Sequence, residues 1–236
     1  MQGVFLDTDT LNPAEMDFSA LEALMPWTFH PLTRPQDRLA RLDGAQVVIT
    51  NKVVLDAAAL KVCPSLKLIC ICATGTNNVD LEAARELGIT VCNVSGYARA
   101  SVAQHTLTMM LSLATRWHLY HRDVKAGAWS RAEQFCLLNH PIMELAGKTL
   151  GLIGHGDLGR EVARLAEALG MQVLVAESFR RHGGQSGRVA LAELLPQADV
   201  LSLHCPLTAQ TDKLVNASFI AQMKPGAFLI NTARGG

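Results

Sequence analysis

Apolar runs of strand length alternate with stretches of helix length along the whole chain. A helix between two strands lets the chain cross over and add the second strand parallel to the first, so this alternation predicts an α/β fold with parallel sheets. The expected strands are residues 4–6, 27–30, 47–50, 68–72 and 90–93 in the first part, and 150–153, 172–176, 200–204 and 227–231 in the second. We therefore predict two α/β domains, residues 1–97 and 98–236.

Two of the expected helices carry recognisable end signals. Asp80 is a suitable N-cap, and Gly88 lies where a left-handed turn would end that helix. A longer helix is expected over residues 101–121. Ser101 and Gln104 fit a capping box at its start, in which their side chains satisfy free backbone amides. We expect Ser101 to serve as a helix cap before any role in a site.

Charge and composition narrow the range of partners. Lysine plus arginine and aspartate plus glutamate both total 21, so the formal net charge is zero and no electrostatic attraction to nucleic acid or an anionic membrane is expected. Hydrophobic residues make up 49% of the chain, which is enough for packed cores. No apolar stretch approaches the roughly 20 residues of a membrane helix. Because the first seven residues lack the basic and apolar runs of a secretory signal, we expect a soluble protein.

The six cysteines stand at positions 63, 70, 72, 92, 136 and 205. None of them has zinc-binding spacing, so no metal site is expected. Cys70 and Cys72 lie two apart in an apolar run and should share one face of a strand. We expect the cysteines to be reduced and buried, in a cytoplasmic protein.

A glycine motif directly follows the expected strand that ends at residue 153. Gly154, Gly156 and Gly159 fit the pattern Gly-x-Gly-x-x-Gly, and an amphipathic helical stretch closed by Gly170 comes next. In such a turn one glycine makes the bend, one admits a pyrophosphate close to the backbone, and one lets helix and strand approach. The start of the helix offers free amides to the phosphates. Strand, turn and helix together predict a dinucleotide site.

Glu177 supports this prediction from the end of the next expected strand. It lies 18 residues after Gly159, close to the offset at which a carboxylate accepts hydrogen bonds from the ribose hydroxyls. An ordinary exposed acid is the alternative. Arg180 and Arg181 follow closely and could accommodate the extra phosphate of NADP, but a carboxylate at position 177 would repel that phosphate. We therefore predict NAD as the cofactor rather than NADP.

Five motifs occur in order, at residues 73–80, at 101–106, in the glycine turn, at 204–208 and at 231–236. With these motifs the chain resembles the D-isomer-specific 2-hydroxyacid dehydrogenases over its whole length. Residues 135–151 are most similar to the bacterial glycerate dehydrogenase, or hydroxypyruvate reductase, branch of that family. The resemblance implies a flavodoxin-like substrate domain at residues 1–97. It implies a Rossmann-type coenzyme domain at residues 98–236, with a dimerisation arm at about residues 101–143.

The resemblance also implies site residues. Backbone amides of the loop matching Thr74 and Gly75 hold the substrate carboxylate, since a glycine turn past a strand end exposes N–H groups to an anion, and Thr74 also touches the cofactor. Arg234 matches the arginine that grips the substrate carboxylate and keto oxygen with paired donors. Without the resemblance, a surface salt bridge would be an equal alternative for Arg234. Besides the glycines and Glu177, the implied cofactor positions are Asp157, Leu158, Cys205, Thr232, Ala233 and Arg234.

For function, the resemblance implies hydride transfer between NAD(H) and a small D-2-hydroxy acid or 2-keto acid, carried out by a homodimer. The branch indicates glycerate, hydroxypyruvate and glyoxylate. Relatives continue beyond the motif containing Arg234 and supply a glutamate and a histidine, the acid–base pair. We expect this chain to lack that pair and the last strands of the coenzyme sheet, and therefore to be inactive on its own.

Two alternatives stay open. A transcriptional corepressor of the same fold would bind NAD without turnover, although no partner-binding surface is evident. A formate or phosphoglycerate dehydrogenase relative would need a basic cluster in the first domain for a phosphate-bearing substrate, and Arg34, Arg38 and Arg41 are available there. Other side chains are expected to be non-catalytic, or to belong to the arm or a core. These are His105, His118, His121, His204, Trp117, Tyr120 and Trp129.

Overall fold

The computed structural model describes residues 1–179 and 186–235. The chain divides into two compact units, Met1–Tyr97 and Ala98–Gly236. The first unit and the second unit are each folded around a sheet of their own. Arg180 and Arg181, the arginines considered for NADP, lie outside the described residues.

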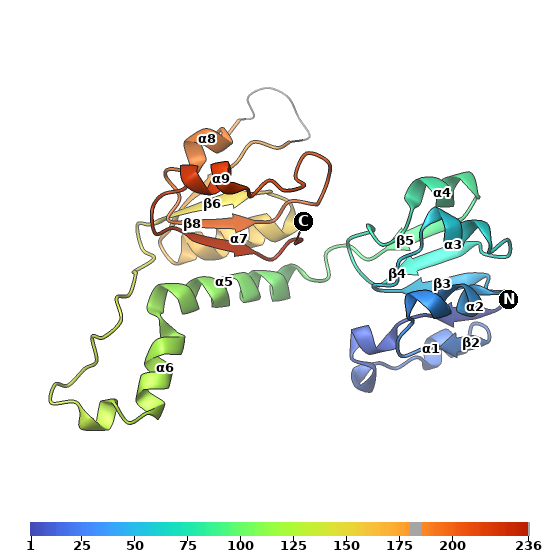
Figure 1. Ribbon diagram of the computed structural model, residues 1–236, viewed down its shortest axis with the longest axis horizontal. Coiled ribbons are helices and arrows are strands. Elements are labelled where there is room, and N and C mark those ends of the chain that lie inside the picture. Colours follow the sequence, from blue (N-terminus) through green and yellow to red (C-terminus); the bar gives the residue numbers. More distant parts are fainter. Residues whose placement is uncertain (180–185, 236) are drawn as a thin grey trace. The chain divides into compact units, whose positions relative to one another are not determined.

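A five-stranded parallel sheet forms the centre of the first unit (Figure 1). Its strands are β1 (Gly3–Phe5), β2 (Trp27–Phe29), β3 (Val47–Thr50), β4 (Leu68–Ile71) and β5 (Thr90–Asn93). Their spatial order, β2-β1-β3-β4-β5, is that of flavodoxin-like folds. Each expected strand of this unit is present to within one residue at either end, and the predicted architecture is confirmed.

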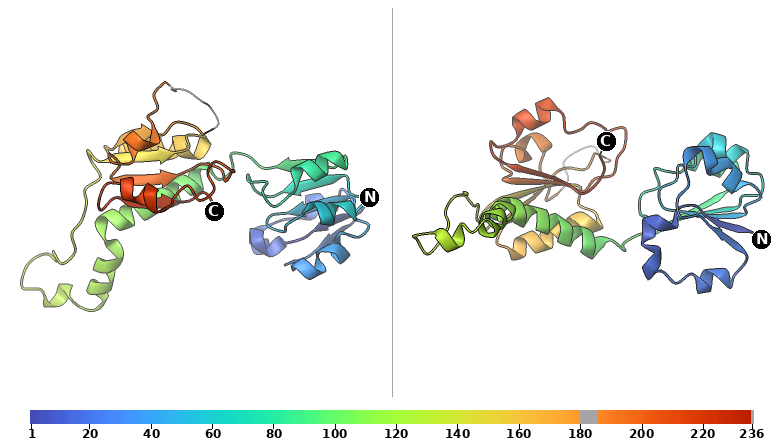
Figure 2. Two further views of the ribbon diagram at one scale, coloured as in Figure 1. Left: turned by 45° about the horizontal axis from the view of Figure 1, so that its top comes forward. Right: turned by 60° about the horizontal axis from the view of Figure 1, so that its bottom comes forward.

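Helices cover both faces of this sheet (Figure 2). On one face a buried apolar cluster, which includes Ile69 and Ile71, holds α2 (Arg38–Leu42), α3 (Ala57–Lys61) and α4 (Leu81–Glu86). The short elements η1 (Thr8–Leu11), η2 (Pro13–Glu15) and α1 (Ser19–Glu22) follow β1, and η3 (Pro35–Asp37) precedes α2. Between η2 and α1, the ring of Phe18 packs against Phe5 and Phe29, with centroid distances of 5.7 and 5.1 Å. The alternation of side chains along β1 directs Phe5 away from the first cluster.

The ends of α4 follow the signals in the sequence. The Asp80 carboxylate accepts a hydrogen bond from the Ala83 amide at 3.0 Å, which makes it the N-cap. Gly88 follows the helix with φ +69°, the left-handed conformation in which glycine carries no steric penalty. Both predictions are confirmed.

The second unit holds a four-stranded parallel sheet whose strands are β6 (Thr149–Ile153), β7 (Gln172–Val175), β8 (Val200–Leu203) and β9 (Phe228–Asn231). Their order is β7-β6-β8-β9, and a bridge from Ala176 places Val189 on the far side of β7. With Val189 in the third position the order becomes 3-2-1-4-5, that of a Rossmann fold. The predicted doubly wound fold is confirmed.

Helices flank this sheet on both faces as well (Figure 2). α5 (Arg99–Thr115) and α7 (Asp157–Ala168) lie on one face and share a buried cluster with Leu150, Leu152 and Val200. α8 (Leu191–Leu194) and α9 (Ala217–Gln222) lie on the other face, where Ile153, Leu201 and neighbouring side chains form a second cluster. The strands are therefore covered on both sides, as a parallel sheet requires.

The helix expected over residues 101–121 is broken. α5 ends at Thr115, Arg116 takes the left-handed conformation at φ +54°, and α6 (Trp117–Lys125) begins anew. The capping box is also wrong, because α5 begins before Ser101 and has Ala98 as its N-cap. Inside the first turn, the Ser101 hydroxyl donates back to the Ala98 carbonyl at 3.2 Å. Such a bond to the carbonyl three residues earlier is typical of serine within a helix.

The first part of the predicted arm, in α5, packs on the sheet of the second unit. Residues 117–144, called the arm from here on, comprise α6, η4 (Trp129–Arg131) and an irregular return segment, and they extend away from that sheet (Figure 1). The Tyr120 hydroxyl donates to the His140 carbonyl at 2.7 Å and ties the two sides of the arm together. Trp117 and Trp129 are 60% and 55% exposed. The two tryptophans therefore do not belong to a core of this chain, which excludes the core role considered for them and leaves a role in the arm.

The described residues contain neither a membrane-spanning helix nor a metal-binding cluster. Within residues 1–179 and 186–235, no helix is both long and apolar enough to cross a membrane. The same residues contain no group of three or more histidine, cysteine, aspartate or glutamate side chains that could hold a metal ion.

Candidate cofactor and substrate site

The turn from β6 into α7 is closely packed at Gly154. This residue has φ +100°, and a Cβ placed on it would lie 2.5 Å from the carbonyl carbon and oxygen of His204. The backbone at the end of β6 therefore packs directly against the backbone that follows β8. These two strands are also the neighbours between which the strand order reverses, and ligands of open α/β sheets bind at such a switch point.

The two other glycines of the motif have different surroundings. A Cβ on Gly159 would collide with the carbonyl oxygen of Gly154, so this glycine lets the first turn of α7 lie directly against the strand end. Gly156 has φ −81°, and a Cβ there would meet no described atom within 4 Å. The motif therefore contains one bend, one close approach and one position that is open to a ligand.

The N-terminus of α7 faces the same turn. Gly156 is the N-cap, and Asp157 and Leu158 are the first two residues of this 12-residue helix. Amides in the first turn of a helix have no partner within it, and the helix dipole adds partial positive charge. Asp157 is paired with Arg160 at 2.5 Å, which partly offsets its negative charge at the start of the helix.

A cavity of about 260 Å³ brings several of the expected residues together. Gly154, Gly156, Glu177 and Cys205 all line it, so the acid at the end of β7 lies on the same hollow as the glycine turn. Several other lining residues were not among the site residues predicted from the sequence. These are His155, Ser178, Phe179, Arg188, Pro206, Thr208, Gln210 and Thr211.

Arg188 enters this cavity through a long-range pairing. Val189 bridges Ala176, and the Glu177 amide donates to the Val189 carbonyl at 2.9 Å, which brings Arg188 beside the end of β7. Burial lowers the pKa of His155, and the charges of Arg188 and Arg160 lower it further. The His155 ring is therefore mostly neutral at neutral pH.

His204 lies beneath the glycine turn, just past the end of β8. Its Nε2 is 2.9 Å from the Ser202 hydroxyl, whereas its buried Nδ1 has no hydrogen-bond partner among the described residues. Burial lowers the pKa of His204 to about 4. The side chain supports the turn as a neutral ring and is a poor proton donor at neutral pH.

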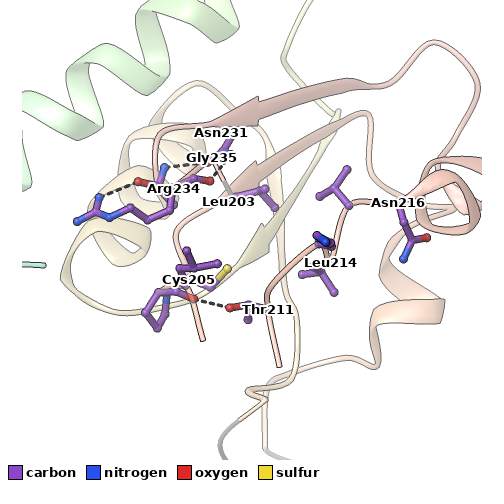
Figure 3. Close-up of a pocket in the computed structure, with 13 residues that line it drawn as sticks. Leu203, Cys205, Thr211, Leu214, Asn216, Asn231, Arg234 and Gly235 are labelled. Atoms are coloured by element: carbon purple, nitrogen blue, oxygen red, sulfur yellow. Dashed lines mark hydrogen bonds between the residues drawn. The ribbon is translucent and has the colours of Figure 1, made fainter. Parts of the chain in front are cut away.

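A second cavity, of about 330 Å³, opens where β8 and β9 end (Figure 3). Cys205, Ala233 and Arg234 line it together with the loop that leads into α9. The Asn231 side chain accepts from the Ala233 amide at 2.9 Å and donates to the Arg234 carbonyl at 2.8 Å, which fixes this short segment. Cys205 lines both cavities, so the two are neighbours along the same strand ends.

The Arg234 guanidinium is exposed and donates to the Ala233 carbonyl at 2.8 Å. It forms no ion pair with any residue that the structure describes, so the surface salt bridge considered as an alternative is not formed. Thr232 lines a third cavity with Ser101 and His105, and its hydroxyl is 3.3 Å from that of Thr106 in α5.

Thr74 and Gly75 lie in the first unit, on the loop after β4. The Thr74 hydroxyl donates to the Val94 carbonyl at 2.9 Å, and the Asn93 side chain donates to the Thr74 carbonyl at 2.7 Å. The end of β5 therefore holds the loop in place at the carboxyl edge of the sheet. At the same edge, the buried Asp7 carboxylate accepts from the Asn51 amide at 2.9 Å and fills the switch point of this sheet.

Comparison with known proteins identifies a family. Residues 107–236 match the family described as D-isomer specific 2-hydroxyacid dehydrogenase, NAD binding domain. The glycerate dehydrogenase of Methylorubrum extorquens is 42% identical over 237 residues, which cover 99% of this chain and 72% of that protein. The hydroxypyruvate reductase of Blautia hydrogenotrophica is 35% identical over 241 residues, covering 100% and 75%. A solved D-lactate dehydrogenase from Aquifex aeolicus, complexed with NAD and lactic acid, has a TM-score of 0.84 at 29% identity, covering 99% and 69%.

The family match begins inside α5 and includes all four strands of the second unit. The two relatives extend the match over the first unit. The resemblance inferred from five motifs is thereby confirmed, together with NAD as the cofactor. The chain belongs to the D-isomer-specific 2-hydroxyacid dehydrogenase family, and it is an NAD-dependent oxidoreductase.

Proposed function

We propose that the reaction for which this chain binds the reactants is the interconversion of glycerate and hydroxypyruvate, with glyoxylate as a further substrate. The observation that carries the cofactor part of the proposal is the cavity shared by Gly154, Gly156 and Glu177, because it combines an open backbone position for a pyrophosphate with a carboxylate for the ribose. The names of the Methylorubrum and Blautia relatives support the substrate class. When bound, NAD supplies the hydride chemistry, and the chain binds and orients the reactants.

In this proposal Arg234 holds the substrate carboxylate and polarises the keto oxygen. Its guanidinium has a main-chain carbonyl as partner, so an incoming carboxylate would not have to displace a charged group. In the first unit, the loop of Thr74 and Gly75 is proposed to offer backbone amides to a substrate carboxylate. The residues proposed to contact the cofactor are Gly154, Gly156, Asp157, Leu158, Gly159, Glu177, Cys205, Thr232, Ala233 and Arg234.

A titration of hydroxypyruvate into the NAD⁺-saturated protein tests the substrate assignment without turnover. Arg234→Gln should weaken hydroxypyruvate binding by about 1.5–3 kcal/mol, the range for hydrogen bonds to charged groups, and leave NAD⁺ affinity unchanged. Arg85→Gln, an exposed arginine on α4, is the matched control. Hydroxypyruvate affinity that is equal in Arg234→Gln and the unmodified protein would contradict the role of Arg234.

The preference for NAD over NADP is assigned to Glu177. Its carboxylate would accept from the ribose hydroxyls of NADH and repel the phosphate of NADPH. Glu177→Ala should therefore narrow the ratio of the two dissociation constants by about tenfold or more, that is, by at least about 1.4 kcal/mol. Glu193→Ala, on α8 and outside the cavity, should leave the ratio unchanged. Equal affinity of the unmodified protein for both cofactors would exclude this assignment.

A phosphate-bearing substrate is not supported by the arginines of the first unit. Arg38 donates to the Val54 carbonyl at 2.6 Å and pairs with Asp56 at 3.0 Å. Arg41 donates to the Thr33 hydroxyl at 2.7 Å. Since these guanidinium groups already serve the fold, they do not form an open cluster with Arg34.

A two-fold homodimer through the arm is the proposed assembly. The arm exposes apolar side chains that a solitary chain would leave in water, among them Phe135 at 91%, Leu138 at 77% and Ile142 at 67%. Light scattering at micromolar concentration should give twice the chain mass. Phe135→Glu should lower it towards the monomer, whereas Leu24→Glu, at a 76% exposed position of the first unit, should not. A monomeric unmodified protein would rule the arm out as an interface.

The proposed location is the cytoplasm. The expectation that the cysteines are buried is wrong, since only Cys63 is buried and Cys92 is exposed. All six are nevertheless free thiols in the structure, and disulfides are the rule in oxidising compartments. Thiol titration of protein purified without reductant should detect all six.

A further inference from the structure

A row of paired positions crosses the sheet of the first unit and ends in two thiols. The register places Phe5 beside Ile49, Ile49 beside Cys70, and Cys70 beside Cys92. These side chains lie on the face opposite to the cluster that contains Ile69, because neighbouring residues of a strand point to opposite faces. Along the row, exposure rises from 2% at Phe5 to a partly exposed Cys70 and an exposed Cys92.

Cys92 lies on β5, which is the last strand of the sheet. Paired residues on neighbouring strands are about 4.7–4.9 Å apart, and their side chains share a face. That spacing falls within the range of about 4.4–6.8 Å between Cα atoms that disulfides occupy. Cys70 and Cys92 thus satisfy the first geometric condition for a bridge between β4 and β5.

Cys72 is a weaker partner for Cys70. It lies two residues further along the chain, a separation of about 6.6 Å in a strand, and its side chain is not directly opposite. Burial, with the Asp7 carboxylate and Cys70 nearby, raises the pKa of Cys72 to about 11, so its thiolate is scarce at neutral pH. Burial also raises the pKa of Cys70, and the proximity of Cys92 contributes to that shift. The two thiols of the row are therefore close enough to interact.

We propose that Cys70 and Cys92 form an oxidation site at which a peroxide converts the two thiols into a disulfide. The exposed Cys92 thiolate attacks one oxygen of hydrogen peroxide, which breaks the O–O bond, forms a sulfenic acid and releases hydroxide. The Cys70 sulfur then attacks the Cys92 sulfur and displaces the sulfenic oxygen as water. In sum, two thiols and one hydrogen peroxide give one disulfide and two waters, and two electrons pass from sulfur to the peroxide.

The position of β5 at the sheet edge makes the bridge feasible. Parallel side chains start about as far apart as the strands, whereas disulfides prefer about 3.5–4.5 Å between Cβ atoms. β5 pairs with β4 on one side only, so a local twist of β5 that brings the two Cβ atoms closer is opposed by the hydrogen bonds of that one pairing. The residual distortion makes such a bridge easy to reduce.

Mild hydrogen peroxide treatment of the reduced protein tests the proposal. Free thiols are then alkylated, and the protein is digested without reductant for mass spectrometry. We expect two of the six thiols to disappear, a peptide pair linked through Cys70 and Cys92, and full recovery with dithiothreitol. Cys136→Ser, in the second unit, should form the same link, whereas Cys92→Ser and Cys92→Ala should form none.

Circular dichroism melts of both Cys92 variants check that they fold, and their exposed position makes folding the expected result. A link between Cys70 and Cys72, links between molecules, oxidation of Cys92 to a sulfinic acid without a link, or six unreacted thiols would each overturn the proposal.

Discussion

Substitution of Gly154 and Gly156 by alanine should separate stability from cofactor binding. In Gly154→Ala, the new methyl group would sit 2.5 Å from the carbonyl of His204 on a backbone with φ +100°. The unfavourable backbone conformation costs about 1–3 kcal/mol, and relief of the overlap costs about 1–3 kcal/mol more. The expected loss of about 2–6 kcal/mol is a large fraction of the net stability of an ordinary domain.

Gly156→Ala should behave in the opposite way. Its φ of −81° suits alanine, and the new methyl group meets no described atom within 4 Å. The free energy of unfolding should stay the same or rise by about 0.4–1 kcal/mol, because alanine restricts the unfolded chain. The methyl group would occupy the approach of the pyrophosphate, however, at a cost of about 1–3 kcal/mol. NADH should therefore bind about 5- to 150-fold more weakly.

Urea titrations followed by circular dichroism measure the first effect, and titrations of NADH fluorescence measure the second. Normal NADH affinity in Gly156→Ala would show that the pyrophosphate does not pass over this residue. Equal losses of stability in the two variants would refute the division of tasks between the glycines. The pair is informative because both substitutions are chemically identical and lie two residues apart.

Three further predictions concern buried polar side chains. Because burial lowers the pKa of His204 from 6.5 to about 4, the unfolded chain binds a proton that the folded chain does not. The contribution of neutral His204 to the free energy of unfolding should be fully present above pH 6.5 and should be lost as the pH drops to 4, by up to about 3 kcal/mol. Urea midpoints measured across this pH range should detect the loss, and His204→Gln should abolish it. Asp199→Asn should lower the free energy of unfolding by about 1–3 kcal/mol, since the carboxylate accepts from the Thr149 amide at 2.9 Å and from Lys224 at 2.6 Å. Lys224→Met should lower it less, because the Lys224 side chain is 47% exposed. Asp7→Asn should destabilise the first unit by a similar amount, since it is 1% exposed and accepts from two backbone amides after β3; an unchanged urea midpoint would contradict this.

The strands could be predicted from the sequence because their signals are local. A strand of a parallel sheet is buried on both faces and reads as a short, continuous apolar run. For residues 47–50, which are mostly buried, the expected and observed strands coincide. Gly88 and Gly170 mark helix ends for an equally local reason, as both adopt positive φ just after a helix.

The break at Arg116 could not be predicted, because distant residues stabilise it. A left-handed arginine is unfavourable by roughly 1–2 kcal/mol, and no glycine or proline marks the position. Its guanidinium lies 5.9 Å from the ring centre of Phe228 on β9, and the Met143 amide donates to the Ala114 carbonyl at 2.8 Å. The capping box predicted at Ser101 was wrong because the pattern is not specific. Any helix interior that carries serine and glutamine three residues apart shows the same pattern as a capping box.

The candidate site was predictable where the motif is continuous and unpredictable elsewhere. Gly154, Gly156 and Glu177 follow a known spacing, and they line one cavity. Arg188 lines that cavity because Ala176 pairs with Val189, and no periodic pattern in the sequence predicts this pairing. Residues brought in by such long-range pairings carry no local pattern of their own.

The contact between Gly154 and the main chain at His204 constrains how sequences of this fold can diverge. Both partners in the contact are backbone atoms, so no change of side chain at His204 or Cys205 can make room for a larger residue at position 154. Related chains can therefore differ in the side chains of the turn that follows β8, at His204 and Cys205. An insertion or deletion in this turn would move its backbone away from Gly154. In an alignment of related sequences, the residue types in this turn should vary, but insertions and deletions should be absent from it. Length variation should accumulate in segments that touch no other main chain.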